Sequence, residues 1–254
     1  MTSINTILSI AASGMLSQQF NLDVISNNVA NVNTAGYRRS RVEFADVVYA
    51  QSGVASEELG LPVAGVRVAA TRTIFAPGTW VSSGSHLDLA IDGEGYFQVL
   101  LPDGSTGYTR SGTFSLDAQG RLVNSEGLVL LPEIRFDVPA ENVDISSDGR
   151  VFVRQNDEIT EVGQITLARF AEPAGLEAVG HGAFRETAAS GAPVAGAPET
   201  VGFGSLVQGT LELSNVDLAE EMVNMITAQR AYQMSSRAAQ VADEMMQVAN
   251  QIQS

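Results

Sequence analysis

The chain of 254 residues contains no cysteine and no lysine. Without cysteine it can form no disulfide, no thiolate metal site and no cysteine nucleophile. All 14 basic residues are arginines, and 29 acidic residues outnumber them, which gives a formal charge of −15. Because a field of that sign repels phosphate backbones and anionic lipid surfaces, we expect no nucleic-acid partner.

Motifs for catalysis and ligand binding are also scarce. The two histidines, His86 and His181, lie far apart in the sequence, and no nucleophile-elbow pattern is present. Residues 93–95 begin a dinucleotide fingerprint, but Gln98 stands where its third glycine belongs, so we expect a turn there. Residues 144–149 resemble a calcium loop only in part and are expected to form a hairpin turn. The sequence therefore predicts no enzyme, no cofactor and no metal site.

Long apolar runs are missing as well. No run approaches the roughly 18 residues that a membrane-spanning helix needs. No basic residue precedes Arg38, and no small-residue cleavage site follows an apolar block. We therefore expect neither a transmembrane helix nor a cleaved secretory signal.

Helix-breaking residues are absent from both ends of the chain. All eight prolines fall between Pro62 and Pro198, the last glycine is Gly209, and the first 35 residues contain a single glycine. Proline and glycine both disfavour helix interiors. The pattern predicts a helix at each end and a turn-rich middle.

The N-terminal segment repeats apolar residues at alternating steps of four and three, which is typical of helices that pack through knobs and holes. Gln18 is the one polar member of this series. The helix is expected to end within residues 31–36, where Gly36 can adopt a left-handed cap. The apolar members are Ile4, Leu8, Ala11, Met15, Leu22, Ile25, Val29 and Val32.

The C-terminal segment mirrors this pattern. Asp217 is a predicted N-cap, and Glu220 and Glu221 follow in the first turn, where negative charge is favourable. The helix from Leu218 to Ile252 would be roughly 50 Å long at 1.5 Å per residue. Its repeating residues are Leu218, Met222, Met225, Ala228, Tyr232, Ser235, Ala238, Val241, Met245, Val248 and Ile252.

Two explanations of these repeats remain open. The two helices can pair only with each other, as one hairpin. Alternatively, the apolar residues beside the main repeats, such as Ile7, Ile10, Phe20 and Ile226, require a second partner, which would be another copy of the chain. In that case the repeats of both helices form a subunit interface.

The middle of the chain, roughly residues 74–170, has the short alternating runs and Gly-bearing turns of β-structure, with hairpin signals at 103–104 and 148–149. Residues 51–65 and 187–205 are predicted to be flexible hinges. The expected fold class is α+β, with long terminal helices packed together and a central, mostly antiparallel β domain. Residues 1–36 and 214–254 would form the helical domain, 37–85 and 187–213 the connectors, and 86–186 the β domain.

Three motifs occur in order along the chain. Residues 27–39 read NNVANVNTAGYRR, residues 87–97 read LDLAIDGEGYF, and residues 214–232 read SNVDLAEEMVNMITAQRAY. Together they closely resemble the bacterial flagellar rod and hook family, from end to end of the chain. The motif positions are Asn27, Asn28, Ala30, Asn31, Thr34, Gly36, Tyr37, Gln229, Arg230, Ala231 and Tyr232.

The resemblance implies a structural protein whose terminal helices pack around a central channel and whose copies stack into a hollow tube. Length and internal motifs are most similar to subunits of the distal rod, a periplasm-spanning drive shaft that transmits torque to the hook. Implied partners are further copies, other rod proteins, the hook, envelope rings and the type III export apparatus. Export without a cleaved signal is also implied, with Phe44 and Val48 matching the gate-recognition pattern.

Alternatives stay open at this point. A proximal rod or short hook-like subunit would differ in the region of residues 51–65, which is shorter here than the polar insertion of many relatives. A secreted fibre protein with a trimeric helical stalk belongs to another class. Such stalks favour Ile and Leu at both repeat positions, whereas the repeats here use Ala, Met and Ser as well.

Overall fold

The computed structural model describes residues 2–49, 63–136, 143–155 and 158–253. Residues 51–62 of the predicted hinge, and the side chains of Ile4, Val48 and Ile252, lie outside the described part. The chain divides into two compact units. We call Met1–Ala30, Ser40–Ile74 and Val216–Ser254 the helical unit, and Asn31–Arg39 and Phe75–Asn215 the β unit.

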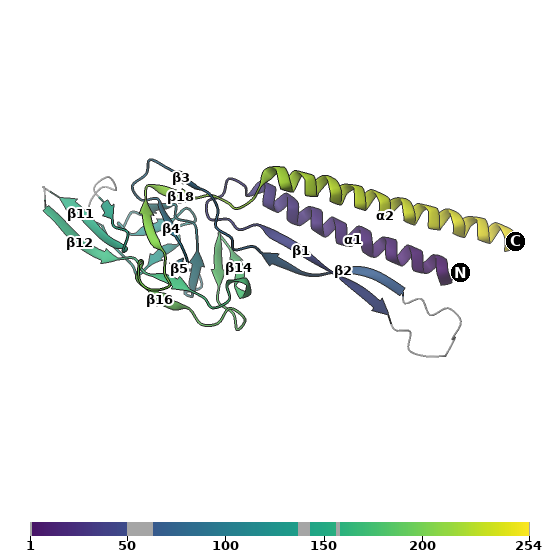
Figure 1. Ribbon diagram of the computed structural model, residues 1–254, viewed down its shortest axis with the longest axis horizontal. Helices are drawn as coiled ribbons and strands as arrows, with labels where there is room; N and C mark the ends of the chain where they lie inside the picture. Colours follow the sequence, from purple (N-terminus) through teal and green to yellow (C-terminus); the bar gives the residue numbers. More distant parts are fainter. Residues whose placement is uncertain (1, 50–62, 137–142, 156–157, 254) are drawn as a thin grey trace. The chain divides into compact units, whose positions relative to one another are not determined.

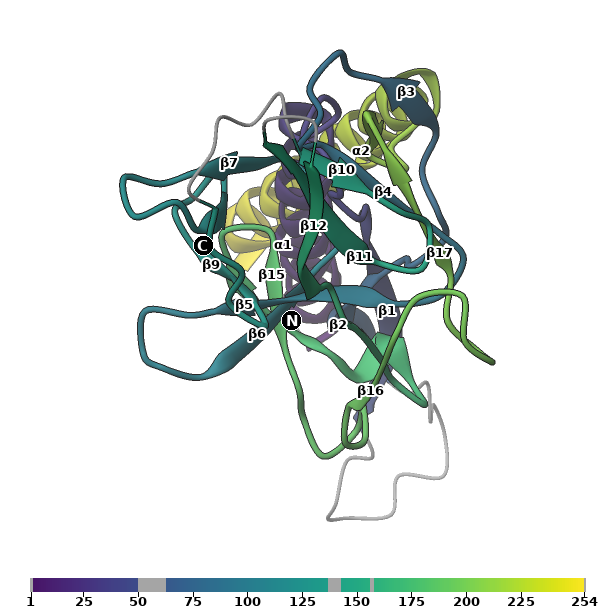
Figure 2. The same cartoon turned by 90° about the vertical axis from the view of Figure 1, so that its left-hand side faces the viewer.

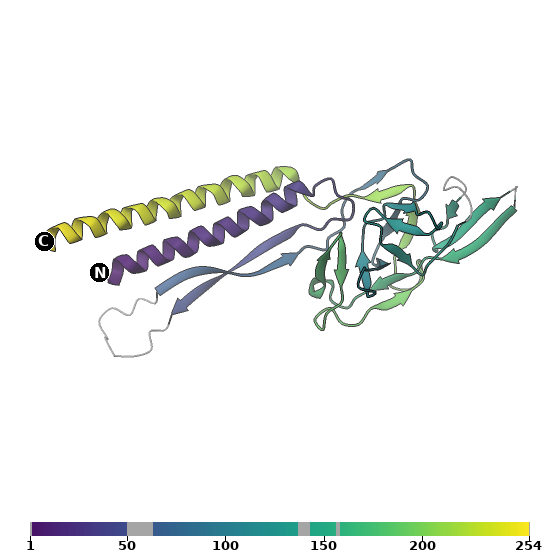
Figure 3. The same cartoon turned by 180° about the vertical axis from the view of Figure 1, so that it is seen from behind.

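The helical unit consists of two antiparallel helices and one β-hairpin. Its elements are α1 (Thr2–Ala30), α2 (Leu218–Gln253), β1 (Ser40–Tyr49) and β2 (Val63–Thr73). The helices lie side by side, with the β1–β2 hairpin along α1 (Figure 1). From behind, both chain termini are seen at the same end of the helical hairpin (Figure 3).

The start of the second helix is as predicted, whereas the first helix ends at Ala30, just before the expected range of residues 31–36. The Asp217 carboxylate accepts hydrogen bonds from the backbone N–H groups of Ala219 (2.8 Å) and Glu220 (3.1 Å), so it caps α2 as expected. At the other boundary α1 ends at Ala30, and Gly36 has a φ of +70°, which glycine adopts without strain. Within α1, Gly14 permits close packing, because a Cβ there would lie 3.1 Å from Oγ of Ser235 on α2.

The expected connector at 37–85 is wrong for most of its described residues. Residues 40–49 and 63–73 form the long antiparallel ladder of β1 and β2, with a register shift between Glu43 and Phe44. The hairpin packs on α1, where Ser17 Oγ donates to the carbonyl of Val66. Polar residues alternate with valines in β1, as in a strand with one face in water, and this pattern was not recognised as a strand.

The β unit contains the other strands, and every ladder between described strands is antiparallel. The path β14-β15-β6-β5-β9-β8-β7 forms the largest sheet, to which β13 and β16 are joined. Figure 2 shows this sheet and the smaller β10-β11-β12 sheet. The strands are β3 (Trp80–Ser82), β4 (Leu89–Asp92), β5 (Tyr96–Leu100), β6 (Thr106–Thr109), β7 (Phe114–Leu116), β8 (Leu122–Asn124), β9 (Val129–Leu131), β10 (Val143–Ile145), β11 (Arg150–Gln155), β12 (Glu158–Gln164), β13 (Leu167–Arg169), β14 (Glu177–Gly180), β15 (Ala183–Arg185), β16 (Val194–Gly196), β17 (Ser205–Gln208) and β18 (Thr210–Glu212), with a 3₁₀ turn η2 (Pro173–Gly175).

Large apolar side chains close the core of the β unit. Phe97 is fully buried, and its ring meets that of Phe114 edge-on at 5.2 Å between centroids. The predicted hairpin turns are present, with φ of +82° at Gly104 and +84° at Gly149. The expected class, α+β with a mostly antiparallel β domain, is confirmed.

The expected connector at 187–213 is also wrong. Within it β16 pairs with β13, β17 with β4, and β18 with β3. These strands are only three or four residues long and lie among glycine, alanine and proline, so the local pattern resembled a flexible segment. Their stability comes from partners distant in the sequence, which local patterns do not reveal.

Candidate assembly surface and chain junction

The repeat of α1 is largely covered by the chain itself. Ala11 and Ile25 are buried, at 6% and 4% exposure. The other members with described side chains are half-buried, namely Leu8, Met15, Leu22, Val29 and Val32. This side of α1 therefore contributes to the fold of a single chain.

The repeat of α2 is not buried in the same way. The most buried apolar residues of α2 are Ala228 and Ala242, at 2% and 0% exposure, and Met225 is half-buried. In the second half of α2 the buried or half-buried positions include Ala239 and Met246, one residue beyond the predicted Ala238 and Met245. Small side chains allow the two helices to approach closely, so packing selects the alanines rather than the larger residues.

Large apolar residues of the helical unit consequently remain exposed. Six of the predicted interface residues of α2 are 37–56% exposed, namely Leu218, Met222, Tyr232, Val241, Met245 and Val248. Further exposed side chains are Val223, Ile226 and Met234 on α2 and Ile7, Ile10, Leu16 and Phe20 on α1. Contiguous exposed apolar surface is typical of proteins that bind another macromolecule.

The first motif shapes the chain after α1. The buried Asn28 side-chain amide donates to the carbonyl of Ser40 (2.8 Å) and accepts from its N–H (2.9 Å), which holds the start of β1 against the end of α1. Asn31 and Thr34 bond to each other in the following turn. A Cβ on Gly36 would lie 2.4 Å from the backbone nitrogen of Ser111, so only glycine fits there.

The other motif positions are less buried. Ala30 and Asn27 are exposed, and Tyr37 is half-buried. In the C-terminal motif Gln229 and Arg230 are exposed, Tyr232 is 37% exposed, and Ala231 is half-buried. The C-terminal motif thus lies mostly on the outside of α2, where folding of one chain does not require it.

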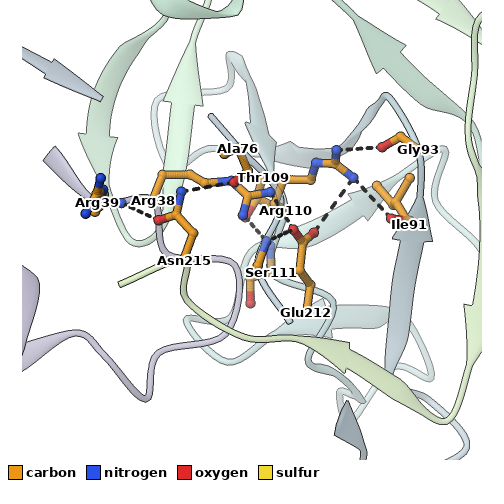
Figure 4. A network of polar contacts seen from close by, with 11 residues as sticks. Arg38, Arg39, Ala76, Ile91, Gly93, Thr109, Arg110, Ser111, Glu212 and Asn215 are labelled. Atoms are coloured by element: carbon orange, nitrogen blue, oxygen red, sulfur yellow. Dashed lines mark hydrogen bonds and ion pairs between the residues drawn. The ribbon is translucent and has the colours of Figure 1, made fainter. Parts of the chain in front are cut away.

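A buried ion cluster lies in the β unit, and the sequence analysis missed it. Nη2 of Arg38 lies 2.7 Å from Oε1 of Glu212, and both side chains are 1% exposed. Nη1 of Arg110 lies 3.8 Å from the second carboxylate oxygen, and Arg110 also donates to the carbonyls of Ile91 and Gly93 (Figure 4). In a buried ion pair of this kind neither residue can be lost without strong destabilisation, because the remaining charge would be uncompensated.

The cluster joins three segments at which the chain enters or leaves the β unit. The Glu212 carboxylate accepts from the N–H of Gly78, and its backbone carbonyl accepts from the N–H of Gly36. Three residues on, Oδ1 of Asn215 accepts from the N–H of Arg39 (2.7 Å), while Nδ2 donates to the carbonyl of Ala76 (3.0 Å; Figure 4). We call residues 36–39, 76–79 and 212–215 the junction.

Burial and neighbouring charges set the pKa values of Arg110 and Tyr96, two ionisable groups around the junction. Burial lowers the pKa of the Arg110 guanidinium, and the nearby Glu212 carboxylate opposes that shift. Burial likewise raises the pKa of Tyr96, whose ring lies under this guanidinium at 5.4 Å. Among the described residues, no group of three or more acidic or histidine side chains could hold a metal ion.

Sequence reasoning could not have found the pairing of Arg38 with Glu212, because 174 positions separate them. A weak signal exists, since Glu212 stands between Leu211 and Leu213 in a short apolar strand. The predicted export pattern lies elsewhere. Phe44 is 43% exposed on β1, and the side chain of Val48 lies outside the described part. Within the described ranges, neither helix is both long and apolar enough to cross a bilayer.

Comparison with known proteins gives three family matches in chain order. Residues 8–38 match the flagella basal body rod protein family, residues 90–153 the flagellar hook protein FlgE/F/G D1 domain, and residues 207–252 the flagellar basal body rod FlgEFG protein C-terminal domain. These ranges contain most of both helices, the junction segments 36–38 and 212–215, and part of the β unit.

Similar proteins extend the match to nearly the whole chain. The flagellar basal-body rod protein FlgG of Borreliella burgdorferi is 46% identical, over 95% of this chain and 96% of the relative. The protein of the same name from Caulobacter vibrioides is 44% identical, over 96% and 98%. The flagellar hook protein FlgE of Treponema pallidum is 36% identical over 60% of this chain, but over only 34% of its own length.

The protein combines a helical hairpin that exposes apolar surface with a β unit, and three flagellar family matches follow one another along its chain. These features define an axial structural protein of the bacterial flagellum. The two rod proteins match this chain over 96% and 98% of their own length, whereas the hook protein matches over 34%. The chain belongs to the flagellar basal-body rod protein family, and its place is the flagellar basal body.

Proposed function

We propose that this chain is a structural subunit of the distal rod, and that copies of it assemble through their terminal helices into a hollow helical drive shaft. The observation that carries this proposal is the exposed apolar surface of α2, on a helix of 36 residues that is about 54 Å long. A single chain leaves this surface in water. Full-length similarity to rod proteins, and only partial similarity to a hook protein, favours the rod over the hook.

The proposed interface comprises the apolar repeats of both helices, in particular their exposed members on α2. Burying apolar surface contributes about 25 cal/mol per Å², so a long contact can offset the entropy lost on assembly. Contacts between different faces of identical subunits do not close on themselves and therefore build a filament. The role is mechanical, and we propose no catalytic activity.

The two compact units suggest a division of labour that refines the expected domains. The helical unit would form the wall of the tube. The junction fixes the crossing segments of the chain to one another within the β unit, which suits a subunit that must carry torque without yielding.

Several parts of the proposal concern other partners. Neighbouring rod proteins, the hook, envelope rings where present and the type III export apparatus would contact the subunit. Phe44 and Val48 are the proposed gate-recognition residues, and exposure of Phe44 on β1 is compatible with this role. Export without a cleaved signal and a periplasm-spanning position complete the proposal.

Two experiments test the function. Purified full-length protein at rising concentration should form hollow tubes by electron microscopy, whereas a strictly monomeric protein under all conditions would contradict self-assembly. Deleting the gene and imaging basal bodies should give structures that stop before the hook. Complete basal bodies in the deletion strain would exclude a role in the distal rod.

A further inference from the structure

The helical unit carries an apolar groove of about 560 Å³ formed by α1, β2 and α2. Small residues line much of it, among them Gly14, Gly65, Ser235 and Ala238. Two large side chains that line it, Ile10 and Met234, are 40% and 71% exposed. Pockets of this volume are large enough to bury a small ligand or several side chains.

The same unit also presents an apolar ridge on α2. Leu218, Met222, Val223 and Ile226 are each 45–63% exposed, and their spacing places them along one side of the helix. None of these four residues lines the groove. One chain therefore presents two exposed apolar surfaces, a groove that is not filled by a large side chain and a ridge that is not buried.

Charge decides between this ridge and the other exposed apolar stripe of α2. Copies with a net charge of −15 repel one another, so they are expected to meet through uncharged surface. Residues 2–22 of α1 contain no charged residue, and neither do residues 222–229 of α2; Glu220 and Glu221 lie at the start of the ridge, and Glu221 is already buried at 4% exposure. In the stripe of Val241, Met245 and Val248, the exposed Glu244 lies three residues after Val241 and four before Val248, so it is beside them on the helix surface and would lose hydration in an apolar contact.

We propose that the groove of one copy receives the α2 ridge of a second copy. This inference rests on the proposed function, and it specifies which faces of the helical unit meet. The contact joins two different faces, so it leaves a free ridge and a free groove at the ends and can repeat indefinitely.

The positions of groove and ridge fix how far the two copies are shifted. Gly14 packs against Ser235 in the antiparallel hairpin, so Ile10 lies level with about residue 239 of its own chain. Ile226 is 13 residues from that level, or about 20 Å along the helix. Two parallel copies are therefore staggered by about 20 Å. That stagger brings Glu220 level with the segment between Arg230 and Arg237, the two basic residues of α2.

Disulfide cross-linking tests the contact against a clean background, because the chain has no cysteine. The full-length double variant Ile10→Cys/Ile226→Cys cannot close a bond within one chain, since a disulfide needs Cα atoms within about 7 Å. Oxidised tubes of this variant should give a ladder of covalent oligomers. A second pair, Met234→Cys/Val223→Cys, uses two highly exposed positions and protects the test against misfolding of the first.

A matched control pairs the groove with the other stripe, as Ile10→Cys/Val248→Cys, and should give no ladder. Tubes that form without a ladder from either test pair, or with a ladder only from the control pair, would overturn the inference and leave the proposed function intact. If the unsubstituted protein forms no tubes, the proposed function fails and the inference fails with it.

Discussion

The two units of the molecule differ in the size of their most buried apolar side chains and in how much large apolar surface they leave exposed. In the β unit the fully buried residues are large, such as Phe97, Leu130 and Leu167, and the core closes within one chain. In the helical unit the most buried apolar residues are Ala242, Ala228 and Ile25, while Met222, Ile226 and Met234 remain in water. The β unit buries its large apolar side chains within one chain, whereas the helical unit leaves several of them exposed, as expected of a surface that binds another molecule.

Buried polar groups differ between the units in a similar way. The β unit encloses full charges at Arg38 and Glu212, which hold the junction. In the helical unit the buried bonds of Asn28 with Ser40 are neutral, although Glu221 is also buried there, at 4% exposure. Removing one partner of a buried ion pair destabilises the fold strongly, because the other charge stays buried without a counter-charge. Removing one partner of a neutral hydrogen bond costs less free energy. Changes in the two units should therefore have different consequences.

The largest effect on stability is expected at the junction. Glu212→Ala removes the counter-charge of the buried Arg38 and should destabilise the β unit by about 3–5 kcal/mol. Urea unfolding followed by the fluorescence of Trp80, the single tryptophan and a neighbour of Glu212 across the β3–β18 ladder, measures the change.

The control is Glu177→Ala, an exposed position on β14 that should stay within about 0.5 kcal/mol of the wild type. Replacing both partners, as Arg38→Met/Glu212→Leu, should recover only part of the loss, because Arg110 still lacks its counter-charge and the N–H of Gly78 still lacks its acceptor. A small effect of Glu212→Ala would show that the ion pair does not hold the junction.

The next effect concerns assembly rather than folding. Ile226→Asp places a charge on the exposed ridge of α2 and should raise the concentration needed for tube formation about 100-fold, the equivalent of about 2.8 kcal/mol. Stability of the monomer should be unchanged, because this side chain is already in water. Asn224→Asp introduces the same charge nearby on α2 and should have a much smaller effect; equal effects would contradict a specific role of the ridge. Sedimentation at a series of concentrations measures both.

A moderate effect is expected where the hairpin meets α1. Asn28→Ala removes two bonds to the backbone of Ser40 and should destabilise the helical unit by about 2 kcal/mol. Far-UV circular dichroism during thermal unfolding reports on the helices. Gln19→Ala, at an exposed position of α1, serves as the control. An unchanged midpoint for Asn28→Ala would mean that the hairpin is held mainly by apolar contacts.

The smallest effect is expected from acid, and it should fall mainly on the β unit. Hydrogen bonds from Ser105, from the backbone of Arg121 and from Ser146 lower the pKa values of Asp103, Asp117 and Asp148 below the usual 3.8. Groups with a lowered pKa in the folded state add stability above pH 3.8 and lose it as the pH falls through the lowered value.

Unfolding followed by Trp80 should therefore show a loss of stability on acidification. The loss should be smaller in the variant Asp117→Asn/Asp148→Asn, which cannot titrate at these two turns. An identical acid response in wild type and variant would assign the effect to other carboxylates.

The sequence predicted those features that depend on neighbouring residues. The helices follow from Asp217 as a cap and from the absence of proline, and the hairpin turns follow from their glycines, whereas α1 ends at Ala30, six residues before the predicted cap Gly36. Features that depend on distant partners were not predictable. These are the β1–β2 ladder, the strands within 187–213, the shift of the α2 contact to Ala239 and Ala242, and the pairing of Arg38 with Glu212.

Because α1 and α2 belong to one unit and residues 75–215 to the other, the β unit is an insertion into a helical hairpin. The size of such an insertion can change without altering the helical hairpin into which it is inserted. The hook protein of Treponema pallidum aligns with this chain over 34% of its own length, so most of that protein has no counterpart here. Proteins whose insertions differ in size can in this way assemble through the same contacts between helices. The diameter of an assembly could then change along its axis while those contacts stay the same.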